Sequence, residues 1–136
     1  MSMFGTFDVA GSALSAQSLR LNLTASNLAN MHNVAGNSDD VYRARHALFR
    51  AAQGTFGQAL AGVDVLGVVE SAAPAIERYD PGHPQANEQG LVYAANVSAM
   101  EEMANMISAS RSYQSNLEVL NTAKDLLLRT LSLGQG

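Results

Sequence analysis

The sequence contains no cysteine. No disulfide can form in it, and no thiolate is available as a nucleophile or as a metal ligand. Such a chain suits a reducing cytoplasm, and it equally suits an extracytoplasmic part that is secreted without oxidative folding.

Positive charge is also scarce. Eight Lys and Arg stand against twelve Asp and Glu in 136 residues, which gives a net charge of −4. A nucleic-acid-binding protein normally carries a basic patch or stripe, and none is visible, so we expect no nucleic-acid partner. Hydrophobic residues make up 47% of the chain, which argues against disorder. The length suits one compact domain, or a small domain with extended arms.

Long apolar runs are missing as well. No segment approaches the ~20 apolar residues that span a bilayer, so we expect no direct membrane insertion. The first basic residue is Arg20, and residues 1–7 are interrupted by Gly5 and Thr6. Because a secretory signal needs a basic start and an apolar centre, we expect no cleaved signal peptide.

Residues that would indicate catalysis are few and scattered. His32, His46 and His83 lie in different predicted elements, without another His or a Cys at metal-ligand spacing. The chain has neither a Gly-x-Ser-x-Gly elbow nor a phosphate-binding glycine loop. The carboxylate pairs at 39–40 and 101–102 occupy a polar loop and a helix start, where structural roles suffice. We therefore expect no catalytic, cofactor-binding or metal-binding residue.

The first part of the chain is nearly without charge. Residues 1–38 carry only Asp8 and Arg20, and they are polar through Ser, Thr, Asn and Gln. A helix that faces water usually carries charges on its exposed face. We therefore expect other protein subunits to cover this segment, with burial inside its own fold as the alternative.

Residues 7–31 are predicted to form a helix of roughly 37 Å. Apolar and small residues recur there at alternating spacings of three and four, which is the heptad pattern of coiled coils. Asn30, Asn33 and Gly36 tolerate the turn conformations that end a helix. The predicted seam consists of Phe7, Ala10, Leu14, Gln17, Leu21, Thr24, Leu28 and Met31.

Residues 97–133 are predicted to form a longer helix of roughly 55 Å, since no Pro or Gly interrupts them. Ser98 and Glu101 have capping-box spacing at its start, and Gly134 can end it. The methionines at its start serve either as core or as an adaptable contact. The predicted seam consists of Met100, Met103, Ile107, Ser110, Tyr113, Leu117, Leu120, Lys124, Leu127 and Leu131.

The middle of the chain alternates between apolar and polar residues, which predicts short strands. The strands are expected at 42–50, 63–70, 75–79 and 91–94. Polar or glycine-containing connections are expected at 37–40 and 53–62. The Asp-Pro-Gly-His-Pro run at 80–84 predicts a tight turn, because proline fixes φ and glycine accepts positive φ.

The predicted fold is α+β and mainly α. Two long terminal helices pair as a coiled coil, and a small β-rich insert lies between them in sequence. The expected division is a core helix at 1–36, an insert at 37–95 and a second core helix at 96–136. The ends of the chain should meet while the insert sits at the far side. A helix pair of this size cannot bury all its apolar positions, so surface remains for partners.

Three groups of residues carry a resemblance to a known family. The N-terminal group is Gly11-Ser12-Ala13-Leu14, Gln17, Arg20-Leu21-Asn22 and Ala25-Ser26-Asn27-Leu28-Ala29-Asn30. The C-terminal group is Asn96-Val97, Glu101-Glu102-Met103, Asn105-Met106-Ile107, Ala109-Ser110-Arg111-Ser112-Tyr113-Gln114, Asn116 and Val119-Leu120-Asn121-Thr122-Ala123-Lys124. The central group is Tyr79-Asp80-Pro81-Gly82-His83-Pro84. Together they resemble the axial proteins of the bacterial flagellum. The central turn and the short length are similar to those of the proximal rod proteins, and the match is weakest at 31–40 and 51–62.

This resemblance implies a structural role. Such proteins leave the cell uncleaved through the flagellar type III export apparatus and polymerise into a hollow rod across the periplasm, which transmits torque from the membrane ring to the hook. The implied partners are copies of the chain, other rod subunits, the rod-to-membrane-ring adaptor, the membrane ring and the export apparatus. A helical array uses contacts that do not close, so each subunit presents two different complementary surfaces.

The expected assembly residues combine the seams with polar residues of the motifs. Asn27 and Asn30 either satisfy free carbonyls at the helix end, as a simple cap would, or bridge to a neighbour. Arg111 and Tyr113 are expected interface anchors, since Arg and Tyr are enriched at binding hot spots. The full set is Leu14, Gln17, Leu21, Asn27, Leu28, Asn30, Met103, Met106, Ile107, Arg111, Tyr113, Asn116, Leu117, Leu120, Asn121, Leu127 and Leu131.

Two other hypotheses remain open at this point. A subunit of another helical secretion-system rod or needle would share export and polymerisation but not the turn at 80–84. A small α+β enzyme would need a cleft with perturbed acids or a bound cofactor, for which the sequence offers no candidate.

Overall fold

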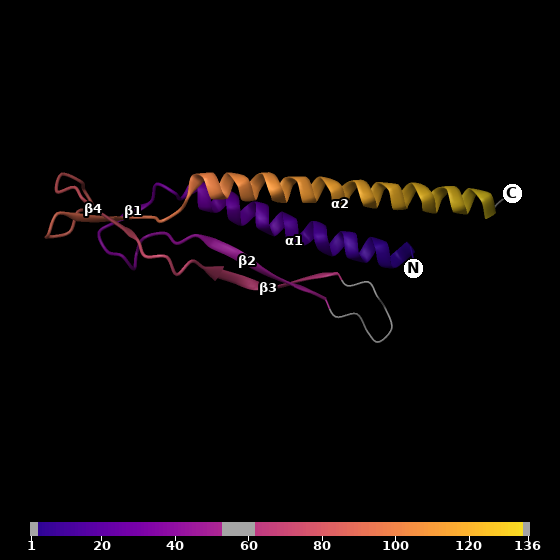
Figure 1. Ribbon diagram of the computed structural model, residues 1–136, viewed down its shortest axis with the longest axis horizontal. Helices are drawn as coiled ribbons and strands as arrows, with labels where there is room; N and C mark the ends of the chain where they lie inside the picture. Colours follow the sequence, from indigo (N-terminus) through magenta and orange to yellow (C-terminus); the bar gives the residue numbers. More distant parts are fainter. Residues whose placement is uncertain (1–2, 53–61, 135–136) are drawn as a thin grey trace.

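The computed structural model describes residues 3–52 and 62–134, in the order α1–β1–β2–β3–β4–β5–α2. Two long helices lie side by side and run in opposite directions, and α2 extends past the start of α1 (Figure 1). A three-stranded sheet lies beyond the other end of the pair, while a two-stranded hairpin runs back along α1 (Figure 1). About half of the chain is helical, and the predicted α+β class is confirmed. Within the described ranges, neither helix has the length and apolar character of a membrane span.

The first helix, α1, spans Met3–Ala29, so it both begins and ends earlier than the predicted 7–31. Its end is fixed by Asn30, whose Nδ2 donates a hydrogen bond to the Ser26 carbonyl at 2.8 Å. The Asn30 N–H donates to the same carbonyl at 3.1 Å, so Asn30 holds the last turn through both its backbone and its side chain. This contact matches the cap, which is one of the two roles considered for Asn30, and the bridge to a neighbour stays a prediction.

The second helix, α2, spans Ala99–Gly134, close to the predicted 97–133. The Ser98 hydroxyl accepts a hydrogen bond from the Glu101 N–H at 3.4 Å, as the serine of a capping box does. Glu101 and Glu102 lie in the first turn, where the helix dipole favours negative charge. The predicted start of this helix is therefore confirmed.

The three-stranded sheet contains β1 (Val34–Ala35), β5 (Leu91–Ala94) and β4 (Ile76–Tyr79), in that order and antiparallel throughout. Val92 in the central strand is 0% exposed, and Ala35, Val41 and Ala95 form a small buried core at this end of the molecule. The strands β4 and β5 were predicted. β1 was not, because two residues are too few to show an alternating pattern.

The turn between β4 and β5 is packed against its own strand. The His83 N–H donates to the Asp80 carbonyl at 3.1 Å, which closes the predicted turn. Gly90 has a φ of 74°, and a Cβ there would lie 2.9 Å from the Tyr79 ring and 3.1 Å from Pro81. A side chain at 90 would therefore meet both steric and backbone strain.

The hairpin joins β2 (Arg45–Ala51) and β3 (Val63–Glu70), with a register shift between Leu48 and Phe49. β2 begins three positions later than the predicted 42–50. The predicted connection at 53–62 lies, apart from residue 62, outside the described residues. The Ser12 hydroxyl of α1 accepts a hydrogen bond from the Val63 N–H at 3.0 Å. The expectation that the whole insert sits at the far side is therefore wrong for the hairpin.

The face that α2 turns toward α1 matches the predicted seam only in part, since Tyr113, Leu120 and Leu127 are half-buried. The buried residues of α2 are Glu102, Ala109 and Ala123, which share one side of the helix because their separations are multiples of seven. Periodicity reports how apolar residues are spaced, not which neighbour covers them. Side-by-side helices are therefore observed, but coiled-coil packing through the predicted seam is not. The predicted seam residues that are exposed include Met100, Met103, Ile107, Leu117, Lys124 and Leu131.

Candidate assembly surface

The contact between the helices is made largely by small and polar side chains. α1 buries Ala10, Ala16, Thr24 and Asn27, and α2 buries Glu102, Ala109 and Ala123. Burial stabilises by about 0.8 kcal/mol per methylene, so alanines contribute far less than leucines would. The large side chains of the α1 seam, Phe7, Leu14, Leu21 and Leu28, are only half-buried.

Large apolar side chains on α2 instead face outward. Soluble monomers rarely leave extended apolar surface in water, and such surface marks contact sites. We call this set the outer apolar surface of α2: Met100, Met103, Ile107, Leu117, Val119, Leu126, Leu128, Leu131 and Leu133.

The C-terminal turns of α2 expose leucines on two sides of the helix. Leu126 and Leu133 are seven residues apart and share one side, and Leu128 and Leu131 share the other. Leu133 is 83% exposed. This part of α2 extends past the start of α1 (Figure 1). A helix with apolar residues on two opposite sides needs two neighbours to cover them.

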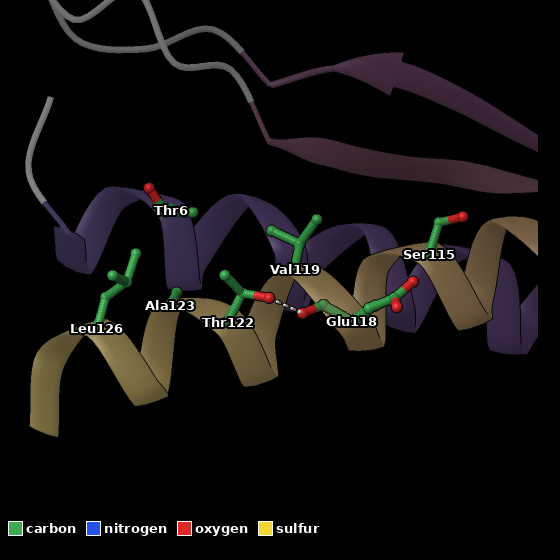
Figure 2. Close-up of a pocket in the computed structure, with 7 residues that line it drawn as sticks. All are labelled: Thr6, Ser115, Glu118, Val119, Thr122, Ala123 and Leu126. Atoms are coloured by element: carbon green, nitrogen blue, oxygen red, sulfur yellow. Dashed lines mark hydrogen bonds between the residues drawn. The ribbon is translucent and has the colours of Figure 1, made fainter. Parts of the chain in front are cut away.

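A groove of about 590 Å³ lies where α2 passes the start of α1. Figure 2 shows that its lining comes from α2, with Thr6 contributed by α1. The Thr122 hydroxyl donates to the Glu118 carbonyl at 2.9 Å, so its hydrogen bond is satisfied within the helix. The other lining residues are Ser115, Val119, Ala123 and Leu126. Two of these lining residues, Val119 and Leu126, also belong to the outer apolar surface of α2. The groove is therefore continuous with that surface.

The hairpin carries a second exposed apolar region, which the sequence analysis did not assign to assembly. Its exposed members are Leu48, Phe49, Val65, Leu66, Val68 and Val69. Arg45–Glu70 at 3.2 Å and Arg50–Asp64 at 3.5 Å pair across the two strands. The signal was present as the apolar run at 63–69, which the alternation rule assigned to a strand with one covered face.

A polar cluster around Asn27 joins three parts of the chain. The Asn27 Nδ2 donates to the Arg45 carbonyl at 3.0 Å and to Glu102 Oε2 at 3.1 Å. Its Oδ1 accepts from the Tyr42 hydroxyl at 2.8 Å and from the Arg45 N–H at 2.9 Å. The Tyr42 hydroxyl also lies 3.2 Å from the Ser26 hydroxyl. The four hydrogen bonds of Asn27 use both donor and both acceptor positions of its side-chain amide.

Asn27 is therefore placed differently from the expectation. It is 0% exposed, and all its hydrogen bonds stay within the subunit, so it bridges elements of one chain and not two chains. Glu102 is 3% exposed, and no ion pair of the described residues reaches it. A buried carboxylate is costly without hydrogen bonds, so the Asn27 amide supports it.

The remaining expected assembly residues fall into two groups. Arg111 and Asn121 are exposed, together with Met103, Ile107, Leu117 and Leu131. Half-buried are Leu14, Gln17, Leu21, Leu28, Asn30, Met106, Tyr113, Asn116, Leu120 and Leu127. Gln17 Oε1 is buried and has no hydrogen-bond partner among the described residues. The structure therefore spreads these residues over inner and outer faces of the helix pair.

No chemical centre accompanies these surfaces in the part of the chain that the structure describes. No group of three or more His, Cys, Asp or Glu there is arranged to hold a metal ion. A second groove, of about 260 Å³, lies between α1, β2 and α2 and is bordered by Arg20, His46 and Asn105. Arg20 donates to Asn105 Oδ1 at 3.0 Å across it, which is a structural contact.

Comparison with known proteins identifies the family. The family model described as "Flagella basal body rod protein" matches residues 7–36, and "Flagellar basal body rod FlgEFG protein C-terminal" matches 88–133. The flagellar basal-body rod protein FlgC of Salmonella typhimurium is 51% identical over 99% of this chain and 100% of its own length. FlgC of Escherichia coli O157:H7 and FlgC of Yersinia enterocolitica are each 50% identical over the same shares.

The chain belongs to the FlgC family of flagellar basal-body rod proteins.

This membership confirms the resemblance drawn from the two helix motifs and the central turn. A FlgC-family chain is a structural subunit of the basal-body rod and not an enzyme. The two family models match the segments that form α1 and α2, together with the last strand of the sheet.

Proposed function

We propose that this FlgC-family chain polymerises into the hollow proximal rod through the outer apolar surface of α2, and that the rod transmits torque and passes exported proteins. One observation carries the proposal. The fully buried residues of the two helices are small or polar, and α2 leaves many of its large apolar residues exposed. Apolar area of this kind drives association in water.

Two different sides of the subunit are needed for a helical array, and the C-terminal turns of α2 provide them. Leu126 and Leu133 lie on one side, and Leu128 and Leu131 on the other. A contact that joins unlike surfaces propagates instead of closing on itself. We assign the core of the rod to 1–36 and 96–136, and an outer insert to 37–95.

The partners in this proposal are copies of the chain and other rod subunits, with the adaptor and the membrane ring at the base. The rod crosses the periplasm, and its subunits arrive uncleaved through the flagellar type III apparatus. The exposed Arg111 and the half-buried Tyr113 serve as anchors at subunit contacts. Asn27 holds α2 from inside the subunit through its hydrogen bond to Glu102, and Asn30 is kept as a half-buried candidate at a subunit contact.

Ile107→Asp tests the proposal. Ile107 is 58% exposed, so a carboxylate there stays hydrated in the isolated subunit and its thermal unfolding should not change. In a rod the same charge would be desolvated without a partner, at a cost of several kcal/mol. A strain lacking the native gene should therefore export the variant but build no rod and lose motility.

Ser108→Asp is the matched control, because it adds the same charge at an exposed polar position one residue away. It should retain most motility. Normal rods with Ile107→Asp would refute the assignment of this face. Failure of the unaltered chain to restore rods would instead refute the proposed function.

A further inference from the structure

The cluster around Asn27 lies where sliding between the helices can be resisted. Burial of apolar area is non-directional, so it opposes separation of two helices more than movement along their axes. Ala109 and Ala123 are buried but small, so they cannot interlock strongly with side chains of the other helix. Hydrogen bonds, in contrast, weaken steeply when distance or angle changes.

Two side-chain hydrogen bonds join the helices within residues 3–52 and 62–134. They are Asn27–Glu102 at 3.1 Å and Arg20–Asn105 at 3.0 Å. A slip of one residue moves a helix by about 1.5 Å, which lengthens and misaligns a hydrogen bond that runs between the helices and so weakens it. Both bonds lie in the half of the helix pair nearer the three-stranded sheet, so the axial register is fixed there.

The same amide also holds the hairpin. The N–H and the carbonyl of Arg45, the first residue of β2, both bond to Asn27, as they would to a neighbouring strand. The Arg45 side chain continues the link to Glu70 of β3 at 3.2 Å. A force on the hairpin therefore reaches α1 through Asn27, and α2 through Glu102.

We infer that the Asn27 cluster is a mechanical joint, which locks the register of α1 against α2 and fixes the hairpin to both. The subunit then carries torsional load as one body. This inference rests on the proposed function in a torque-transmitting rod. Asn27, Tyr42 and Glu102 are positioning residues, since they act through the elements that they join. Asn27 and Glu102 are buried within the subunit, and Tyr42 is half-buried.

Reversing one bond tests the joint. Asn27→Asp removes both amide donors and places two carboxylates together in a buried site, so we expect at least about a tenfold loss of complete rods. In Asn27→Asp with Glu102→Gln, the new amide can donate back to the new carboxylate. Rods and swimming at low load should then exceed those of Asn27→Asp by several-fold, because the cross-helix bond is restored. Recovery should stay incomplete, because the Arg45 carbonyl still lacks the donor that Asn27 gives it.

Tyr42→Phe separates load-bearing from folding. It deletes a hydroxyl that bonds Asn27 and Ser26 but keeps the ring, so rods should form in normal number. A small bead on the filament should rotate at normal speed. Cells tethered by their filaments work at high load, and they should stop or shed hooks with rod fragments. Tyr79→Phe, at an exposed tyrosine outside the cluster, should behave normally at both loads.

Two results would overturn the inference. One is a double variant that is no better than Asn27→Asp, because the cross-helix bond would then not be what matters. The other is a Tyr42→Phe strain that sustains rotation at high load. Rods restored by the unaltered chain in the same experiments would leave the proposed function intact in either case.

Discussion

The two ends of the molecule differ in how much of their apolar surface the chain covers for itself. In the three-stranded sheet, Val92 is 0% exposed, and Ala35, Val41 and Ala95 form a small core at the same end. At the other end, α2 passes the start of α1 and exposes Leu131 and its neighbouring leucines.

This difference separates what the subunit does alone from what it does in an assembly. The sheet end has antiparallel pairing and a closed turn, so its backbone finds partners within the chain. Val92 and Ala95 are buried there, while Ile76 and Tyr79 of the edge strand β4 are exposed. An isolated helix gains most of its stability from packing, and the last turns of α2 have little to pack against. We therefore call the three-stranded sheet the finished end, because its strands pair within the subunit. We call the C-terminal turns of α2 the unfinished end, because neighbouring subunits would cover their leucines.

Removing residues 126–136 should have the largest effect and should fall on one end alone. The deletion takes away Leu126, Leu128, Leu131 and Leu133, and each leucine buried in an assembly contributes about 1.5–3 kcal/mol. We expect no rods in a strain that carries only this form. The purified subunit should still show slow amide exchange at 91–95, and loss of that protection would show that the ends fold together.

Much of this contrast was visible in the sequence. The positions of both helices, the turn at 80–84 and the strands at 76–79 and 91–94 followed from period, capping residues and turn residues. These elements could be predicted from local signals, because each element depends mainly on residues that are close to it in the sequence.

The tertiary contacts could not be read in the same way. Asn27 was assigned to an interface, yet it is buried by Arg45 and Glu102, which lie 18 and 75 residues away in the chain. The face of α2 against α1 was also misplaced in part, because Ala109 and Ala123 are too small to stand out in an apolar pattern. When a helix has two apolar faces, long-range packing decides which neighbour each face contacts. Periodicity in the sequence carries no information about that choice.

Val92→Ala should show the opposite effect from the truncation. It opens a cavity in the finished end, and we expect a loss of about 2 kcal/mol in the unfolding free energy of the isolated subunit. Urea denaturation measures this loss. Leu128→Ala removes more carbon at an exposed position, yet it should cost under about 0.5 kcal/mol in the subunit. Equal losses would erase the distinction between the ends.

Ser98→Ala should have the smallest effect, and it probes whether α2 links the two ends. The Ser98 hydroxyl accepts from the Glu101 N–H at 3.4 Å, a long bond at an exposed residue. Loss of an N-cap costs about 0.5–2 kcal/mol, and we expect a value near the lower limit. Amide exchange at 101–102 should then speed up by a few-fold, since 1.4 kcal/mol corresponds to a factor of about ten.

The position of that change is more informative than its size. Ser132→Ala is the matched control, because it removes a hydroxyl near the other end of α2 that donates to the Arg129 carbonyl at 2.8 Å. It should leave exchange at 101–102 unchanged. If the ends are independent, Ser98→Ala should leave exchange at 126–134 unchanged, since opening of the first turn need not pass through the part held by Ala109 and Ala123. Faster exchange along the whole of α2 would instead make the helix one cooperative unit. The leucine-bearing turns would then draw stability from the sheet end, and the division into a finished and an unfinished end would fail.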